Sequence, residues 1–165
     1  MLDALPHAEV RAAPEGPELI ILGLGADHAG DDAIGLEVAR ALAARGAPAR
    51  PCADASMLLA LLVDGEALVL VDAYQSDEPA GHVRELALGE LETRAQPVSS
   101  HGLGVAEALA MARALGLDLA LTNVRIAGVS LGPTPNVAPG APLSPALAAA
   151  FEPLAALALE LTRRP

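Results

Sequence analysis

Two adjacent carboxylates, a separate aspartate and a histidine are the residues of this sequence best placed to do chemistry. Asp31 and Asp32 follow the apolar run at residues 19–22 and a short glycine-containing loop. Asp72 comes directly after a second apolar run, ALVLV, and His101 precedes a helix-forming segment. Carboxylate oxygen and imidazole nitrogen together suit divalent metals from manganese to zinc, nickel included. These residue types predict a metal site, provided that the fold brings them together.

The order of apolar and polar segments predicts a fold that does so. Apolar or alternating runs indicate strands at about 18–24, 49–53, 67–71, 82–86 and 123–131. Helical patterns lie between them, at about 31–45, 57–63, 103–115 and 145–162. This alternation predicts an α/β fold, a three-layer α/β/α sandwich with a mostly parallel, mixed sheet of about five strands. Because residues that follow parallel strands converge on one edge, the Asp31/Asp32 pair, Asp72 and His101 should meet there.

Composition and charge limit the classes of function. A length of 165 residues suits one domain, expected at 18–165 after a Pro-rich, charged leader at 1–17 that should be mobile. The net charge of -11 argues against nucleic acid and against anionic membrane surfaces as partners. No apolar run reaches the roughly 18 residues that span a bilayer. Cys52 is the only cysteine, which excludes an intramolecular disulfide and a cysteine-based zinc site and fits a cytoplasmic protein.

Each candidate residue also has a purely structural interpretation. Asp31 or Asp32 could cap the first helix, because acidic side chains stabilise helix N-termini. Asp72 could be a turn residue, and a single histidine before a helix, such as His101, is more often structural than a ligand. The occurrence of all of them at one predicted sheet edge favours a site over independent coincidence.

The glycines at residues 23–25 resemble the start of a dinucleotide-binding fingerprint. The third glycine of that motif is missing, because position 28 is His28. No bound dinucleotide cofactor is therefore predicted, and the glycines are expected to allow close approach of the backbone. His28 is either a fourth ligand or a solvated loop residue, and we expect the latter.

The segment GVSLG around Ser130 matches the G-x-S-x-G nucleophile elbow. A serine hydrolase using Ser130, His101 and Asp72 is therefore an alternative. The elbow requires a helix directly after the serine, whereas Pro133 and Pro135 follow here.

Four segments together resemble the hydrogenase maturation endopeptidases, the nickel-dependent proteases that process the large subunit of nickel–iron hydrogenases. GLGADHAGDDAIG is similar to the family's G-x-G-N and D-D/E-G-x-G segment, and LVLVDAYQSDEPAGHVREL to its V-D-A segment. SSHGLGVAEALAMARALG is similar to the S-x-H-x-L-G-L segment that opens a helix. RIAGVSLGPTP and APLSPALAAAFEPL resemble the closing strand, the Pro-rich loop and the start of the last helix. The resemblance extends over residues 19–160, with the four segments in the family's order.

The resemblance implies that Asp32, Asp72 and His101 contact nickel. The metal is expected to arrive in the precursor of the hydrogenase large subunit, which is the expected partner, and need not be resident in the protease. The implied reaction is removal of the precursor's C-terminal extension by an aspartate- and histidine-dependent endopeptidase.

The sequence departs from the family's pattern in the loops around the predicted site. Ala26 replaces an asparagine, Ala33 replaces the glycine after the acidic pair, and residues 52–55 replace a Gly-Gly-Thr segment. These departures keep open an alternative in which the chain binds metal and precursor without cutting the peptide bond.

Overall fold

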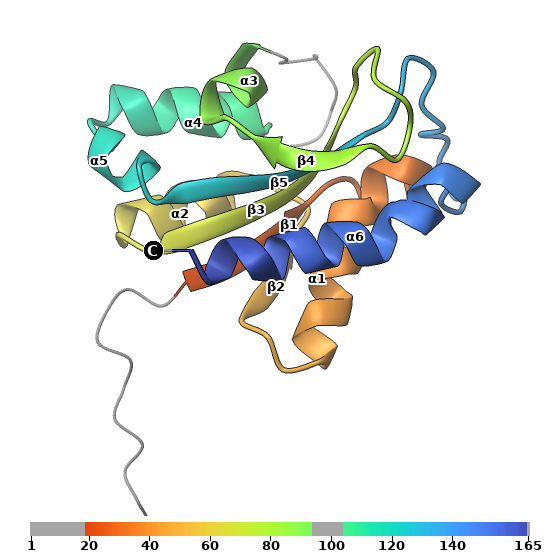
Figure 1. The fold of residues 1–165 in the computed structure, drawn as a ribbon. Coiled ribbons are helices and arrows are strands. Elements are labelled where there is room, and N and C mark those ends of the chain that lie inside the picture. Colours follow the sequence, from red (N-terminus) through yellow and green to blue (C-terminus); the bar gives the residue numbers. More distant parts are fainter. Residues whose placement is uncertain (1–18, 94–103, 165) are drawn as a thin grey trace, which may run out of the picture.

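The computed structural model describes residues 19–93 and 104–164 and contains a five-stranded sheet (Figure 1). Its strands are β1 Leu19–Leu24, β2 Ala49–Cys52, β3 Ala67–Tyr74, β4 Val83–Leu86 and β5 Val124–Ser130. The order is β2-β1-β3-β5-β4, in which β4 alone runs antiparallel to its neighbour. The predicted mostly parallel, mixed sheet is confirmed. The predicted leader lies outside the described residues.

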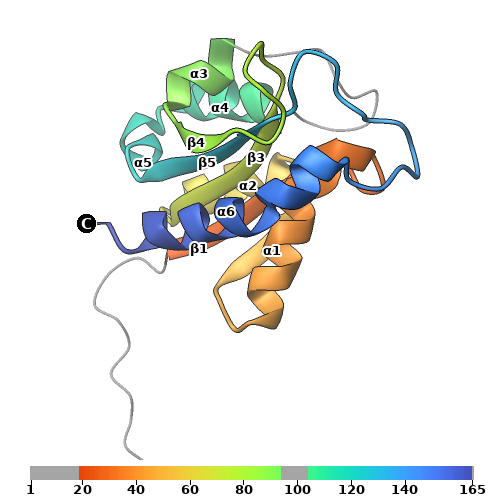
Figure 2. The ribbon, with the colours of Figure 1, turned by 45° about the vertical axis from the view of Figure 1, so that its right-hand side comes forward.

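Helices cover both faces of this sheet, as the α/β/α prediction requires. One face carries α1 Ile34–Ala44 and α6 Pro145–Thr162, which contact each other (Figures 1 and 2). The other face carries α2 Ser56–Val63, α3 Leu88–Thr93, α4 Val105–Ala114 and α5 Asp118–Leu121. The short helices α3 and α5 were absent from the sequence-based prediction, because elements of four to six residues are too short to show a helical period.

The strands divide the apolar core into two layers by simple alternation. Leu22 and Leu70 point toward α2 and α4, whereas Ile21, Val69 and Val71 point toward α1 and α6. All five side chains are fully buried. Because successive strand residues point to opposite faces, the even-numbered residues of β3 face α2 and α4. Asp72 therefore belongs to that face.

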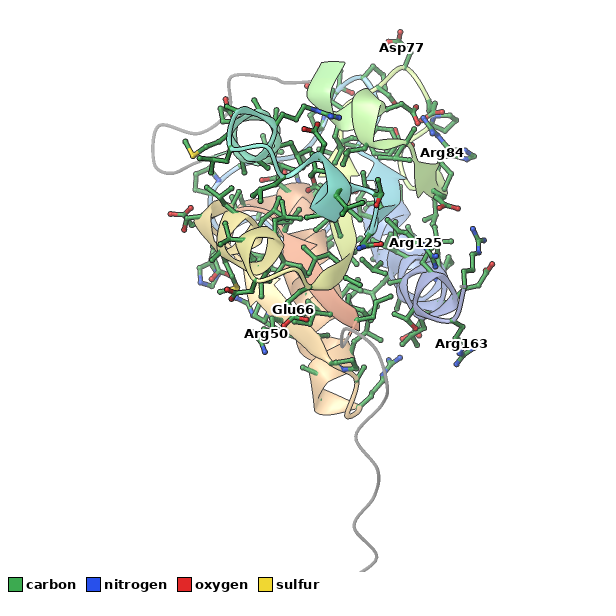
Figure 3. The ribbon with its side chains drawn as sticks, turned by 90° about the vertical axis from the view of Figure 1, so that its left-hand side faces the viewer. Arg50, Glu66, Asp77, Arg84, Arg125 and Arg163 are labelled. Carbon is green, nitrogen blue, oxygen red and sulfur yellow. The ribbon has the colours of Figure 1, made fainter. Side chains whose placement is uncertain are left out.

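The helix α6 has the bounds that the sequence predicts, with Ser144 as N-cap residue and Pro145 in the first turn. By length and composition alone it could cross a membrane, but a core helix passes the same test, and its apolar residues Leu154 and Leu161 are buried in the core. Arg125 of β5 donates hydrogen bonds to two carbonyls at the end of this helix region, those of Leu161 and Arg164, and Figure 3 shows it beside that end. α6 is thus held against the sheet along its length.

Candidate functional site

The carboxyl ends of β1 and β3 form the switch point of the sheet, the edge termed the crevice. From β1 the chain passes through α1 to β2 on one side, and from β2 it returns through α2 to β3 on the other side. The helices α1 and α2 therefore lie on opposite faces of the sheet. In open α/β sheets, such a switch point is where ligands bind. Loops after β1, β3 and β5 gather at this edge (Figure 1).

Glycines allow the first helix to pack directly on the strand that precedes it. A Cβ atom at Gly23 would lie 2.1 Å from the carbonyl oxygen of Gly35, and one at Gly35 would lie 2.1 Å from that of Leu24. A Cβ at Gly25, whose φ is +144°, would lie 2.1 Å from the carbonyl oxygen of Asp32. The expected close backbone approach is confirmed. It brings the helix start, with its acidic pair, onto the end of β1.

Asp32 lies in a 3-10 turn, η1 Gly30–Ala33, that leads into α1. Its Oδ2 accepts a hydrogen bond from the backbone N–H of Ala26, 3.1 Å away across the loop. Burial raises the pKa of this carboxyl above its usual value, and the bond from Ala26 partly offsets the rise. No side chain caps η1 or α1 through a hydrogen bond, but Asp32 lies in the first turn of η1, where an acidic side chain stabilises the helix start.

Asp72 lies inside β3, and the prediction that the strand ends there is wrong. The pairing of β3 with β1 stops at Gly23 opposite Val71, but its pairing with β5 continues to Tyr74, with Asp72 opposite Gly128. The partner strand β5 thus extends β3 beyond the apolar run visible in the sequence. Asp72 is the first residue of β3 beyond its pairing with β1, which leaves it at the crevice.

The two carboxylates Asp32 and Asp72 influence each other. Burial raises the pKa of Asp72 to about 8, and the negative charge of Asp32 adds to the rise. A hydrogen bond of 2.9 Å from the N–H of Ala73 to Oδ1 acts in the opposite direction. Two acids that repel each other in a desolvated site favour the uptake of a proton or a cation. Asp32 and Asp72 are therefore near enough for their charges to interact, whereas their joint contact with a metal stays a prediction.

His101, the third predicted member, lies outside the described residues, so its part in the site stays a prediction. Within residues 19–93 and 104–164, no group of three or more His, Cys, Asp or Glu side chains is arranged to hold a metal ion. His28 is exposed, with a left-handed φ of 57°, as expected for a solvated loop residue.

Asp31 has a contact that the sequence did not suggest. Its side chain is 2% exposed, and Oδ1 accepts a hydrogen bond from the N–H of Ser144, the N-cap residue of α6, at 2.6 Å. Asp31 lies in the first turn of η1, as the capping alternative supposes, but its carboxylate accepts its hydrogen bond from the N-terminus of α6. A carboxylate at such a position contributes about 0.3–1 kcal/mol. Because the two residues are 113 positions apart, no local pattern could reveal the pair.

Ser130 is fully buried at the end of β5, which removes the serine-hydrolase alternative. Its hydroxyl donates to the carbonyl of Glu78 at 3.1 Å, accepts from the N–H of Gly132 at 3.0 Å and contacts the hydroxyl of Ser76 at 2.9 Å. The serine therefore holds the loop between β3 and β4 against β5.

The same loop is held by ionic and aromatic contacts. The Tyr74 hydroxyl donates to Glu78 at 2.7 Å, and burial together with this bond raises the pKa of Tyr74 to about 12. Arg84 binds both Glu78 and Glu90 and lies over the Tyr74 ring, 5.4 Å from its centre. Figure 3 shows Arg84 on the body of the protein and Asp77 projecting from the loop above it. These contacts fix the loop between β3 and β4 in place.

No protein-family model and no curated protein sequence matches the chain. Among solved structures, the NiFe hydrogenase maturation protease HybD from Thermococcus kodakarensis is 25% identical, with a TM-score of 0.65, over 88% of this chain and 99% of that one. The hydrogenase maturating endopeptidase HybD from E. coli is 22% identical, with a TM-score of 0.63, over 88% and 91% of the two chains. The chain has the fold of the hydrogenase maturation proteases. The resemblance inferred from the sequence is confirmed.

A third similar structure is an endopeptidase from Escherichia coli, 23% identical with a TM-score of 0.65 over 88% of this chain and 93% of that one. The likeness to the maturation proteases thus extends over nearly the whole of their chains.

The departures from the maturation-protease pattern are accommodated without strain where the structure describes them. Ala33 has φ -80°, which any residue adopts, so no glycine is required there. Ala26 supplies its backbone N–H to Asp32 whatever its side chain. Cys52 is buried, and its thiol donates to the carbonyl of Asp54 at 2.8 Å, as expected for a small core residue. Asp54 in turn accepts from the N–H of Ser56 at 2.8 Å.

Proposed function

We propose that this chain is an endopeptidase that recognises nickel in the precursor of a hydrogenase large subunit and removes the precursor's C-terminal extension. The observation that carries the proposal is the pair Asp32 and Asp72, two mutually repelling carboxylates at the switch point of a maturation-protease fold. The solved structure at 25% identity is itself described as a hydrogenase maturation protease.

In this proposal Asp32 and Asp72 contact the nickel that the precursor brings. Carboxylate oxygen suits nickel, and a divalent cation relieves the repulsion between the two acids. His101 is proposed as the third contact. α4 begins at Val105, four positions after it in the sequence, and packs on the face to which Asp72 belongs. Figure 1 shows α4 running toward α5 and the start of β5, so its first turn is the end nearer the crevice.

The bond cleavage is proposed to be a hydrolysis assisted by one of the two carboxylates. The carboxylate takes a proton from water as the water oxygen attacks the carbonyl carbon, the C–N bond breaks, and the proton passes to the leaving amine. Nickel in the substrate would polarise the carbonyl. A cytoplasmic location is proposed along with this reaction, because the single cysteine is buried and unpaired.

The test is cleavage of a large-subunit precursor prepared with and without nickel. We expect the wild-type chain to shorten the loaded precursor only, and Asp32→Asn, Asp72→Asn and His101→Ala each to lower the rate by at least about a hundredfold. Asp27→Asn is the matched control, because Asp27 lies in the same loop but pairs with Arg40 at the surface, with 46% of its side chain exposed. Equal cleavage by wild type and the Asp32 and Asp72 variants would refute the assignment.

Binding of the loaded precursor without cleavage would instead favour the non-enzymatic alternative. Calorimetry with the same precursor distinguishes these outcomes, since it detects binding whether or not a bond is cut.

A further inference from the structure

The segment at residues 131–144, called here the β5–α6 loop, lies against the loop that carries Asp32 (Figure 2). The N–H of Asp31 donates to the carbonyl of Asn136 at 2.8 Å, and the N–H of Gly140 donates to that of His28 at 2.6 Å. The third contact is the bond from the Ser144 N–H to the Asp31 carboxylate. The only side chain among these hydrogen-bonding groups is that of Asp31.

The carboxylate of Asp31 is placed for this contact and not for contact with a substrate. It is 2% exposed, whereas Asp32, next to it in η1, keeps part of its surface open to solvent. A Cβ at Gly30, whose φ is +58°, would lie 2.3 Å from the carbonyl oxygen of Asn136. The two segments are therefore in direct backbone contact at η1.

The β5–α6 loop is also tied to the other side of the crevice. The side-chain amide of Gln75, which directly follows β3, donates to the carbonyl of Pro133 at 3.3 Å. One loop thus contacts both the segment that carries Asp32 and the end of the strand that carries Asp72. A change in its position would alter the separation of the two carboxylates.

We propose that Asp31 is a positioning residue of this site. By accepting the Ser144 N–H, its buried carboxylate fastens the β5–α6 loop and the start of α6 to η1, and this holds the Asp32 carboxylate at the Ala26 N–H, facing Asp72. The kinetic part of this proposal rests on the proposed function, whereas the structural part can be measured on the chain alone.

Two pairs of variants separate the hydrogen bond from other properties of these residues. Asp31→Ala removes the acceptor, whereas Asp31→Asn keeps an oxygen at the same place and loses only the charge. Ser144→Pro removes the N–H donor at a backbone position whose φ of -63° suits proline. Ser144→Ala keeps the N–H and is its matched control, because the Ser144 side chain makes no capping bond.

The first experiment follows solvent exchange of two backbone amides by NMR in the full chain without metal. The Ser144 amide reports on Asp31, and the Ala26 amide reports on Asp32. We expect Asp31→Ala to speed exchange at both amides by about tenfold or more. In Ser144→Pro, we expect the same increase at the Ala26 amide. Asp31→Asn and Ser144→Ala should stay within about threefold of wild type. Faster exchange at Ser144 with an unchanged exchange rate at the Ala26 amide would overturn the proposal. Asp31 would then stabilise only the start of α6 and would not position Asp32.

The second experiment measures cleavage of the nickel-loaded precursor by the same variants. We expect Asp31→Ala and Ser144→Pro to lower kcat at least tenfold with less than a threefold change in KM, and Asp31→Asn to restore most of the rate. A loss of rate in Asp31→Asn equal to that in Asp31→Ala would overturn the proposal, because the charge would then matter and not the hydrogen bond. If wild type cuts no precursor, the proposed function fails, and the amide measurement still decides the positioning role.

Discussion

Replacing Asp72 with asparagine should make the metal-free protein more stable at neutral pH. The pKa of Asp72 rises from 3.8 to about 8 in the folded chain, chiefly because burial disfavours its charge. Between these values the folded protein holds a proton that the unfolded chain has released, so the free energy of unfolding falls as pH rises. The proton on Asp72 contributes fully to the stability of the folded state below about pH 4. This contribution is lost progressively as the pH rises to about 8.

The size of the effect follows from the difference between the two pKa values. Between the two pKa values, the free energy of unfolding falls by about 1.4 kcal/mol for each pH unit. The free energy of unfolding of the wild type should therefore be lower at pH 7 than at pH 4 by at most about 4 kcal/mol. Water reaches part of the Asp72 side chain and screens its charge, so we expect about 2 kcal/mol. Asparagine has a similar shape and no charge, and Asp72→Asn should not suffer this loss.

The assay is urea unfolding of both proteins at pH 4, 5, 6, 7 and 8 in the presence of a chelator. All 21 acidic residues affect the wild-type curve, so the informative quantity is the difference between variant and wild type at each pH. This difference should grow from near zero at pH 4 to about 2 kcal/mol at pH 7. The control Asp27→Asn, at an exposed ion pair, should show no such gain.

A constant difference across the pH range, or an Asp72→Asn protein less stable than wild type at pH 7, would refute the reasoning. Either result would mean that Asp72 is ionised in the folded chain at neutral pH without cost. The same result would weaken the proposed cation site, since that site depends on two carboxylates that are unfavourable together.

Three further predictions concern metal affinity, packing and the buried serine. Nickel affinity of the chain should rise about tenfold per pH unit between pH 6 and 8, with release of a proton from Asp72 detectable by calorimetry in two buffers. Gly35→Ala should cost about 3 kcal/mol in thermal unfolding, because its Cβ would meet the Leu24 carbonyl, whereas Gly89→Ala, with nothing within 4 Å, should cost nothing. Ser130 should resist a fluorophosphonate probe, and Ser130→Ala should lower stability by about 1–3 kcal/mol because it leaves buried backbone groups unpaired.

Local patterns in the sequence were sufficient for much of the fold. The apolar runs of β1, β3 and β5 and the cap and proline at the start of α6 are short-range features, and the structure has these elements within a few residues of their predicted bounds. The proximity of Asp32 and Asp72 followed from the rule for parallel strands. The structure differs from the prediction at two places because of partners distant in sequence. Pairing with β5 extends β3 past Asp72, and the N–H of Ser144 donates to the carboxylate of Asp31.

The remaining misses have the same physical origin. The G-x-S-x-G pattern around Ser130 carried no information on burial, which is set by the loop between β3 and β4 packed over the serine. For Asp31, capping of the first helix was one interpretation, whereas its hydrogen bond goes to the start of α6. In both cases the residue type indicated a hydrogen bond, and only the tertiary fold selected its partner.

The interior place of β5 in the sheet bears on when activity can first arise during synthesis. β5 lies between β3 and β4, both of which precede it in the chain. Neither of these two strands can therefore complete its pairing with β5 until residue 130 has been made. The polypeptide must grow further, to Ser144, before Asp31 gains its partner. A nascent chain that ends before Ser144 therefore lacks both the complete sheet and the partner of Asp31, so the surroundings of Asp32 and Asp72 assemble only after these residues have been made.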